Sequence, residues 1–149
     1  MLRIASILLV LSAGIITAAP VPKVKVKDAD TLLGKWVIVE LSHSGMGAQE
    51  GYQDAVVTLD KDTMAVKAPT KPDSDERMGY KLDQDKKHID LRPNEGAGAN
   101  VELQGIYELD GDTLIIAIPI GGKGERPAEV KPGPGIAYLK LRRIKEEKK

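Results

Sequence analysis

The sequence predicts an all-β protein whose eight strands form an antiparallel up-and-down barrel. From residue 35 onward, apolar residues alternate with polar ones over short runs, and Gly, Pro, Asp and Asn bound these runs. No stretch of ten residues after residue 19 has a convincing helical period. An open sheet of eight strands would expose two edges, so we expect the sheet to close.

Residues 1–19 are typical of a signal peptide. Arg3 supplies a positive start, an apolar run follows from Ile4 to Leu11, and small residues lead to Ala19. The apolar stretch is shorter than the ~20 residues that a membrane-spanning helix needs. We therefore expect an exported protein, periplasmic or extracellular.

The leader has two candidate cleavage sites. A cut after Ala19 places Pro20 next to the scissile bond, where its ring and missing N–H hinder a protease that binds extended backbone. A cut after Gly14 is the alternative. Without either cut the leader would tether the protein to the membrane. We expect association with a membrane only in that case.

The remaining elements follow in order. Residues 20–31 form a linker that opens with the extended segment PVPKVKVK. Separately, residues 28–33 are expected to form one helical turn, capped by Asp28 or Asp30. Residues 32–143 form the barrel domain, and residues 144–149 a charged, solvated tail. The expected strands are 35–42, 54–60, 64–68, 78–83, 87–92, 101–109, 113–119 and 136–143.

The connections support consecutive hairpins. Asp110-Gly111-Asp112 joins two alternating runs and is a strong hairpin signal. Short polar turns at residues 60–63 and 83–87 join two further pairs of expected strands, 54–60 with 64–68 and 78–83 with 87–92. The segment 120–135 is rich in Gly and Pro, and we expect it to form a long loop over one barrel mouth.

The composition excludes several classes of function. Lys plus Arg and Asp plus Glu each number 22, so no concentrated basic surface is available for nucleic acid. The chain has no cysteine, no phenylalanine and one tryptophan. Disulfides, thiolate metal sites and aromatic platforms for single-stranded nucleic acid are therefore not expected.

No motif predicts catalysis or a cofactor. Five Asp-x-Asp pairs lack the spacing of a 12-residue Ca²⁺ loop, and turn formation explains them better. His43 and His88 lie far apart in sequence, and Gly121-Gly122-Lys123-Gly124 is followed by neither Ser nor Thr. We expect a protein that is not an enzyme, with no catalytic residue, no metal and no cofactor.

A resemblance to a known family rests on several motifs. Gly34-Lys35-Trp36 is similar to the Gly-x-Trp signature of lipocalins. The chain from about residue 32 to 143 resembles a family of uncharacterised lipocalin-like domains abundant in Planctomycetes. The matching segments are LGKW at 33–36, YKLD at 80–83, HIDL at 88–91, GIYELDGDTL at 105–114 and RPAE at 126–129. Val130 departs from the family pattern, which has Phe after the Arg-Pro motif.

The resemblance implies a lipocalin-like barrel but brings no activity with it. It also implies a structural clasp in which Arg142 or Arg143 of the last strand packs on Trp36. A barrel of this size holds side chains or one small ligand, so we expect a non-enzymatic module that binds a small apolar or amphipathic ligand. The alternative is a solid-packed structural module that binds a cell-envelope protein.

The expected lining of the barrel follows from the alternation within each strand. If Trp36 points inward, Ile38 and Glu40 do too, so Glu40 would be the one carboxylate inside, paired with a cation such as Arg142 or available to a ligand. The complete expected lining is Trp36, Glu40, Tyr80, Leu82, Leu91, Leu103, Tyr107 and Ile116.

Overall fold

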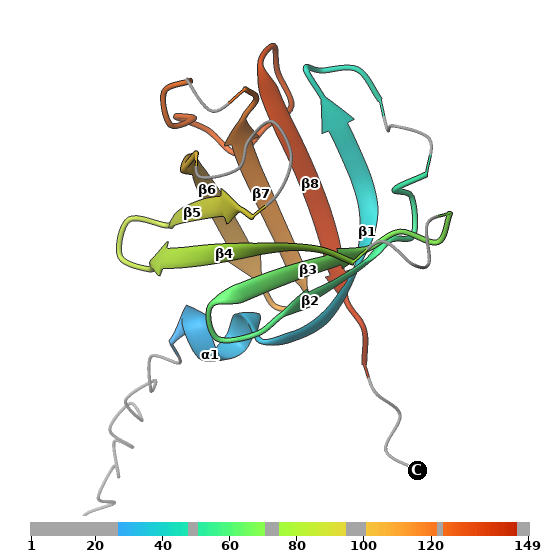
Figure 1. Ribbon diagram of the computed structural model, residues 1–149. Helices are drawn as coiled ribbons and strands as arrows, with labels where there is room; N and C mark the ends of the chain where they lie inside the picture. The colour runs from blue at the N-terminus through green and yellow to red at the C-terminus, as the bar shows by residue number, and fades with distance from the viewer. Residues whose placement is uncertain (1–26, 48–50, 71–74, 95–100, 122–123, 146–149) are drawn as a thin grey trace, which may run out of the picture.

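A closed eight-stranded antiparallel barrel makes up the described part of the computed structural model (Figure 1). The structure describes residues 27–47, 51–70, 75–94, 101–121 and 124–145. Each strand pairs with its neighbours in sequence, and β1 pairs with β8 to close the barrel. The expected fold class, an all-β up-and-down barrel of the lipocalin-like kind, is confirmed.

One short helix precedes the strands, α1 (Asp28–Leu32). The strands are β1 (Gly34–His43), β2 (Val56–Leu59), β3 (Thr63–Lys67), β4 (Asp75–Asp83), β5 (His88–Pro93), β6 (Leu103–Asp110), β7 (Thr113–Pro119) and β8 (Ile136–Arg143). The largest difference from the expected ranges is the start of β4. Its first charged residues gave no apolar signal, yet they complete the ladder with β3.

The two ends of the barrel differ. Short turns join β2 to β3, β4 to β5 and β6 to β7 at the end that α1 covers, which we call the closed end. Longer connections join the other strands at the opposite end, which we call the open end. Leu32 of α1 is almost fully buried and belongs to the core at the closed end.

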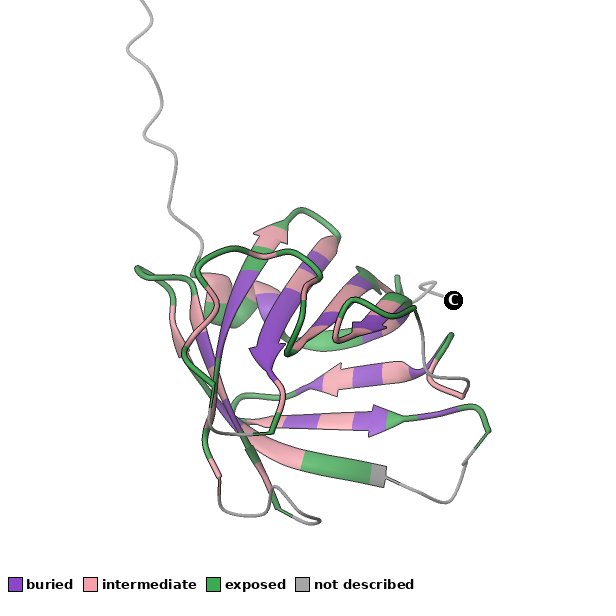
Figure 2. Cartoon of the chain, turned by 90° about the horizontal axis from the view of Figure 1, so that it is seen from above, coloured by how far each residue is buried: buried purple, intermediate pink, exposed green. Residues whose placement is uncertain are grey.

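The core fills the barrel with a single cluster of apolar side chains. Buried residues alternate with more exposed ones along most strands, as Figure 2 shows. The largest fully buried side chains include Trp36, Tyr107, Ile38, Ile116 and Leu141, contributed by four strands. Side chains that face inward therefore pack against each other across the barrel.

A β-bulge interrupts β1. Ile38 pairs with Leu141 of β8 and Glu40 pairs with Lys140, so Val39 is an extra residue opposite β8. Beyond the bulge the alternation is reversed: Leu41, opposite Leu139, faces inward and Glu40 faces outward. The expectation that Glu40 lies inside the barrel is wrong, because one inserted residue moves every following side chain to the other face.

The connection between β7 and β8 does not lie over the mouth as expected. Its described part, the outer segment (residues 124–135), runs along the outside of the barrel. At one end Gly124 packs closely on Pro119 and Arg126 binds Asp90 and the carbonyl of Gly105. At the other end Gly133 lies 3.8 Å from the Cβ position of Gly45.

A row of outward-facing residues explains this path. Ser42, Tyr138, Ala117 and Ile106 are neighbours across β1, β8, β7 and β6, and all four are buried although they lie outside the barrel core. The outer segment crosses this wall and shields small and apolar side chains that would otherwise contact water.

Candidate functional site

The closed end of the barrel is held by contacts around Trp36. This side chain is 0% exposed, and its indole Nε1 donates a hydrogen bond of 2.9 Å to the carbonyl of Leu32 in α1. The guanidinium carbon of Arg143 lies 4.1 Å from the centre of the Trp36 ring system. Arg143 also donates hydrogen bonds to the carbonyls of Leu33, at 3.0 Å, and of Thr31.

These contacts form the clasp that the resemblance implied. Of the two candidate cations, the structure places Arg143 on Trp36, and its Nε lies 3.5 Å from Oδ1 of Asp112. Arg142 faces outward and is exposed. The Trp36–Arg143 pair thereby connects the last strand to α1 and to the start of β1.

A second group of contacts anchors α1. The Tyr107 hydroxyl donates a hydrogen bond of 2.8 Å to Oδ2 of Asp28, and Lys87 forms an ion pair with the same carboxylate. Burial raises the pKa of Tyr107, and the hydrogen bond to Asp28 raises it further. Burial opposes ionisation of Asp28, but hydrogen bonds from Lys87 and Tyr107 outweigh it and lower the pKa of that carboxyl.

The inward-facing side chains divide into two sets along the barrel axis. Toward the closed end the largest of them, such as Trp36, Tyr107 and Leu114, are fully buried and packed, and Leu82 and Leu109 are partly exposed. Toward the open end several remain partly exposed while still packing on the core. These partly exposed residues are Leu41, Met78, Leu103 and Leu139.

The expected lining residues fall on both sides of this division. Trp36, Tyr107 and Ile116 are fully buried, and Tyr80 is buried with its hydroxyl donating to the carbonyl of Asp60. Leu91 is buried and Leu82 is partly exposed near the closed end. Leu103 alone of the expected set belongs to the partly exposed group at the open end. Sequence reasoning missed Leu139, which the alternation in β8 places on the face of Leu141, and Leu41, which the bulge concealed.

The polar residues at the open end come from β1, β4 and the segment that follows β1. His43 faces inward, opposite Ala137. The Tyr52 hydroxyl donates a hydrogen bond of 2.7 Å to the Glu76 carboxylate, and this bond raises the pKa of Tyr52. Thr70 donates to the carbonyl of Gly51, so the connection after β1 is fastened to the side of β3 and β4.

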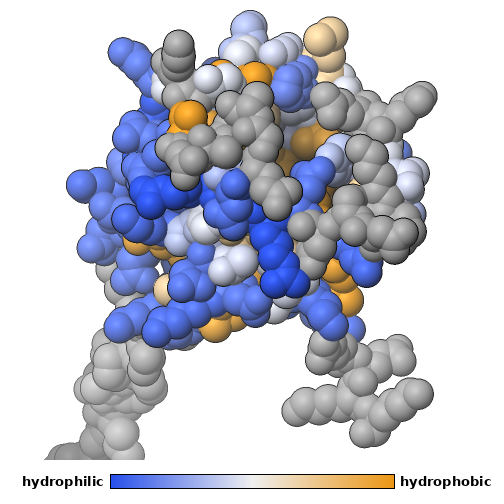
Figure 3. Space-filling model, in the orientation of Figure 1, coloured by the Kyte–Doolittle hydropathy of each residue, from blue (hydrophilic) through white to orange (hydrophobic). Residues whose placement is uncertain are grey.

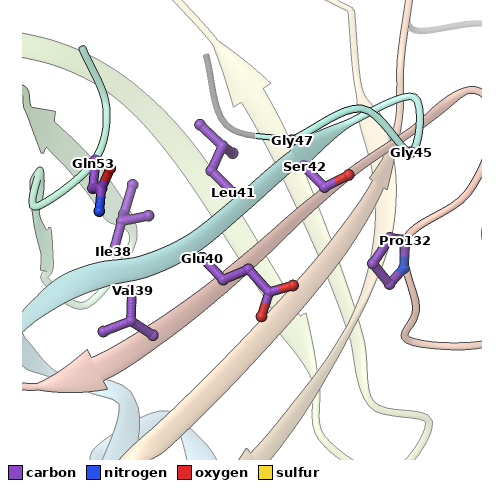
Figure 4. A pocket seen from close by; sticks show the side chains of 9 residues that line it. All are labelled: Ile38, Val39, Glu40, Leu41, Ser42, Gly45, Gly47, Gln53 and Pro132. Carbon is purple, nitrogen blue, oxygen red and sulfur yellow. The ribbon is translucent and has the colours of Figure 1, made fainter. Parts of the chain in front are cut away.

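A cleft opens in the barrel wall beside the bulge (Figure 4). β1 pairs with β2 only over Gly34–Val37, so the rest of β1 separates from the segment that carries Gln53. The cleft has a volume of about 360 Å³. Its lining residues are Ile38, Val39, Glu40, Leu41, Ser42, Gly45, Gly47, Gln53 and Pro132.

The candidate site is therefore the open end of the barrel together with this lateral cleft. Hydrophilic side chains cover most of the face shown in Figure 3, and hydrophobic atoms show there in small groups, several of them at the upper, open end. His43 and His88 lie on different strands and face opposite sides of the barrel wall. Among the described residues, no group of three or more His, Asp or Glu side chains is arranged to hold a metal ion.

No protein-family model, no curated protein and no solved structure matches this chain. Within the described part of the chain, no helix is long and apolar enough to cross a membrane.

Proposed function

We propose that this protein is a non-catalytic, exported, lipocalin-like module that binds a small apolar or amphipathic ligand at the open end of its barrel. One observation carries the proposal: the largest inward-facing apolar side chains are fully buried at the closed end, whereas Leu41, Leu103 and Leu139 are partly exposed at the open end. Apolar surface inside a concave wall favours an apolar ligand, because binding removes that surface from water.

The packing also limits the ligand. Trp36, Tyr107 and Leu114 fill the closed half, so a ligand contacts only the open half, through Leu103, Leu139 and their neighbours. The polar groups nearby, His43 and the Tyr52–Glu76 pair, suit a ligand with one polar end. The leader in the sequence supports an extracytoplasmic location.

The test compares two substitutions at adjacent positions of β8. Leu139 faces inward and Lys140 faces outward, so Leu139→Asn and Lys140→Asn place the same side chain on opposite faces. The probe is 8-anilinonaphthalene-1-sulfonate, an apolar ring system with one anionic group. We expect the unmodified protein and Lys140→Asn to enhance its fluorescence, and Leu139→Asn to bind it at least about fivefold more weakly.

Native mass spectrometry of the protein from its own host provides the second measurement. A retained small molecule supports the proposal. Empty protein together with no enhancement of probe fluorescence contradicts it and favours the alternative, a structural module that binds an envelope protein. The tight packing of the closed half supports this alternative, because a filled barrel has no interior space for a ligand.

A further inference from the structure

The edge of β1 that faces away from β8 is left incomplete beside the bulge. The backbone N–H of Ser44 donates a hydrogen bond to the carbonyl of Ile136, the first residue of β8. Because hydrogen-bonded positions alternate along an antiparallel strand, the backbone N–H and C=O of Ser42 and Glu40 also point toward β8. The backbone groups of Leu41 and His43 then point the opposite way.

Leu41 lies in a gap on this edge. On one side of the gap Ile38 exchanges hydrogen bonds with Ala55 and Asp54, at 2.9 and 3.3 Å. On the other side His43 exchanges hydrogen bonds with Met46, at 3.0 and 3.1 Å. Within the described ranges, no backbone group pairs with the N–H and C=O of Leu41 on this edge.

The lateral cleft gives access to this gap. Val39 is 40% exposed, and two glycines, Gly45 and Gly47, add no side chain to the cleft wall. Figure 4 shows Leu41 on one side of β1 and Glu40 directed to the other. The cleft therefore exposes a donor and an acceptor of one extended residue, with an apolar side chain on one side and a carboxylate on the other.

These features specify the chemistry of a partner. One residue of an extended chain matches both Leu41 groups, because residues opposite each other in a ladder exchange N–H···O=C bonds. The partner residue opposite Leu41 places its side chain on the inner side, and the residues flanking it place theirs on the outer side beside Glu40. An apolar residue between basic residues satisfies both sides.

We propose that the gap at Leu41 in the edge of β1 docks an extended segment of alternating apolar and basic residues, supplied by residues 20–27 of a second copy of this chain. That segment reads PVPKVKVK: its valines alternate with Lys23, Lys25 and Lys27, and it has no acidic residue. Glu40 supplies the complementary charge at the edge.

The segment of the same copy is too short to reach. The four residues from Val24 to the start of α1 can span at most about 13 Å, even when fully extended. α1 lies at the closed end, and the part of β1 from Gly34 to Leu41 already spans about 23 Å toward the open end. A contact between the linker of one copy and the edge of the next joins two different surfaces, which produces rings or filaments.

A labelled peptide tests the docking directly. The full chain is expressed with its leader and collected after export, and fluorescein-labelled PVPKVKVK is titrated while its anisotropy is followed. The peptide PVPVVKKK has the same composition without the alternation. We expect PVPKVKVK to bind at least about tenfold more tightly, and equal binding of the two peptides overturns the proposal.

Variants of the edge separate this site from other surfaces. We expect Glu40→Lys to weaken peptide binding by about three- to tenfold, whereas Glu108→Lys, an exposed carboxylate on β6, leaves it unchanged. Leu41→Pro removes the backbone N–H of residue 41, which points away from β8, so all hydrogen bonds to β8 are kept. We expect this variant to lose peptide binding. If Leu41→Pro does not fold, the comparison of Glu40→Lys with Glu108→Lys still tests the proposal. Unchanged peptide binding by Glu40→Lys overturns it.

Sedimentation velocity tests whether the partner is a second copy. We expect the exported protein to assemble as its concentration rises, Lys25→Glu to reduce assembly, and Lys25→Glu with Glu40→Lys to restore it. A monomer at every concentration, alongside specific peptide binding, overturns the assignment to a second copy.

Discussion

Arg143 concentrates several interactions in one side chain at the closed end. Its guanidinium covers the Trp36 ring, donates to two backbone carbonyls and lies beside Asp112. The planar guanidinium suits this set of partners, because it presents several donors in fixed directions and stacks on aromatic rings. The adjacent Arg142 has the same charge but faces outward.

Substitution of Arg143 should therefore destabilise the protein far more than substitution of Arg142. We expect Arg143→Ala to lower the free energy of unfolding by about 2–3 kcal/mol, because it removes hydrogen bonds from a charged donor and a cation–π contact. Arg142→Ala should change it by less than about 0.5 kcal/mol. Urea unfolding followed by Trp36 fluorescence measures both, and equal effects would show that the clasp adds nothing to stability.

Asp28 makes the anchoring of α1 sensitive to acid. Its pKa lies below the ordinary value of 3.8 in the folded protein, so the carboxylate stabilises the fold above about pH 4. This stabilisation is lost as the pH falls through the folded pKa. We expect Asp28→Asn to be less stable than the unmodified protein by about 1–2 kcal/mol at pH 7, through loss of the charged hydrogen bonds.

The difference between Asp28→Asn and the unmodified protein should shrink as the pH falls below 4. Urea unfolding at pH 7, 5, 4 and 3 measures it, with Asp30→Asn as the control, because Asp30 is exposed on the same helix. A difference that is the same at every pH would mean that the ionised carboxylate contributes nothing.

The bulge is the element that decides which side chains of β1 face the barrel interior. Val39 is the extra residue, and the pairing on both sides of it is regular. Deletion of Val39 would leave Ile38 opposite Leu141 and Glu40 opposite Lys140, with a continuous alternation between them. Deletion of Leu41 would instead leave its inward position to Glu40, or turn Ser42 and His43 to the opposite faces.

We therefore expect deletion of Val39 to be tolerated, with a change in unfolding free energy of about 1 kcal/mol or less. Deletion of Leu41 should unfold the protein, because it removes an inward apolar side chain and either turns the Glu40 carboxylate inward or exchanges the faces of Ser42 and His43. Circular dichroism and urea unfolding of the two purified deletion variants measure the outcome. An equal loss of unfolding free energy in both deletion variants would mean that the bulge is needed for folding.

The alternation of apolar residues was enough to predict all eight strands and the inward face of β6, because each strand has one face in the core and one nearer to water. The bulge leaves no such signal, since Val37, Ile38 and Val39 are all apolar. The sequence pattern consequently places Glu40 on the wrong face. The course of the outer segment could not be predicted either, because the wall that it covers joins β1 to β8, β7 and β6, and its four buried residues meet only in the closed barrel.

At the scale of the whole molecule, the barrel combines a closed half built around fully buried large side chains with an open half that is less completely buried. α1, the clasp and the fully buried aromatic side chains stabilise the closed half. The open half carries the longer connections, the lateral cleft and the partly exposed apolar residues. A binding surface is best placed at the end where packing constrains it least, on a scaffold that the other end holds together.

Two leucines of β8 test this division, because both face inward and they lie two residues apart. Leu141 is 0% exposed near the closed end, and Leu139 is partly exposed toward the open end. We expect Leu141→Ala to cost about 3–4 kcal/mol of unfolding free energy, since a packed site leaves a cavity, and Leu139→Ala to cost less than about 1.5 kcal/mol. Urea unfolding of the two variants, monitored by circular dichroism, gives the difference. Similar losses would show a core that is equally packed along its axis, and the open end would then offer no apolar surface to a ligand.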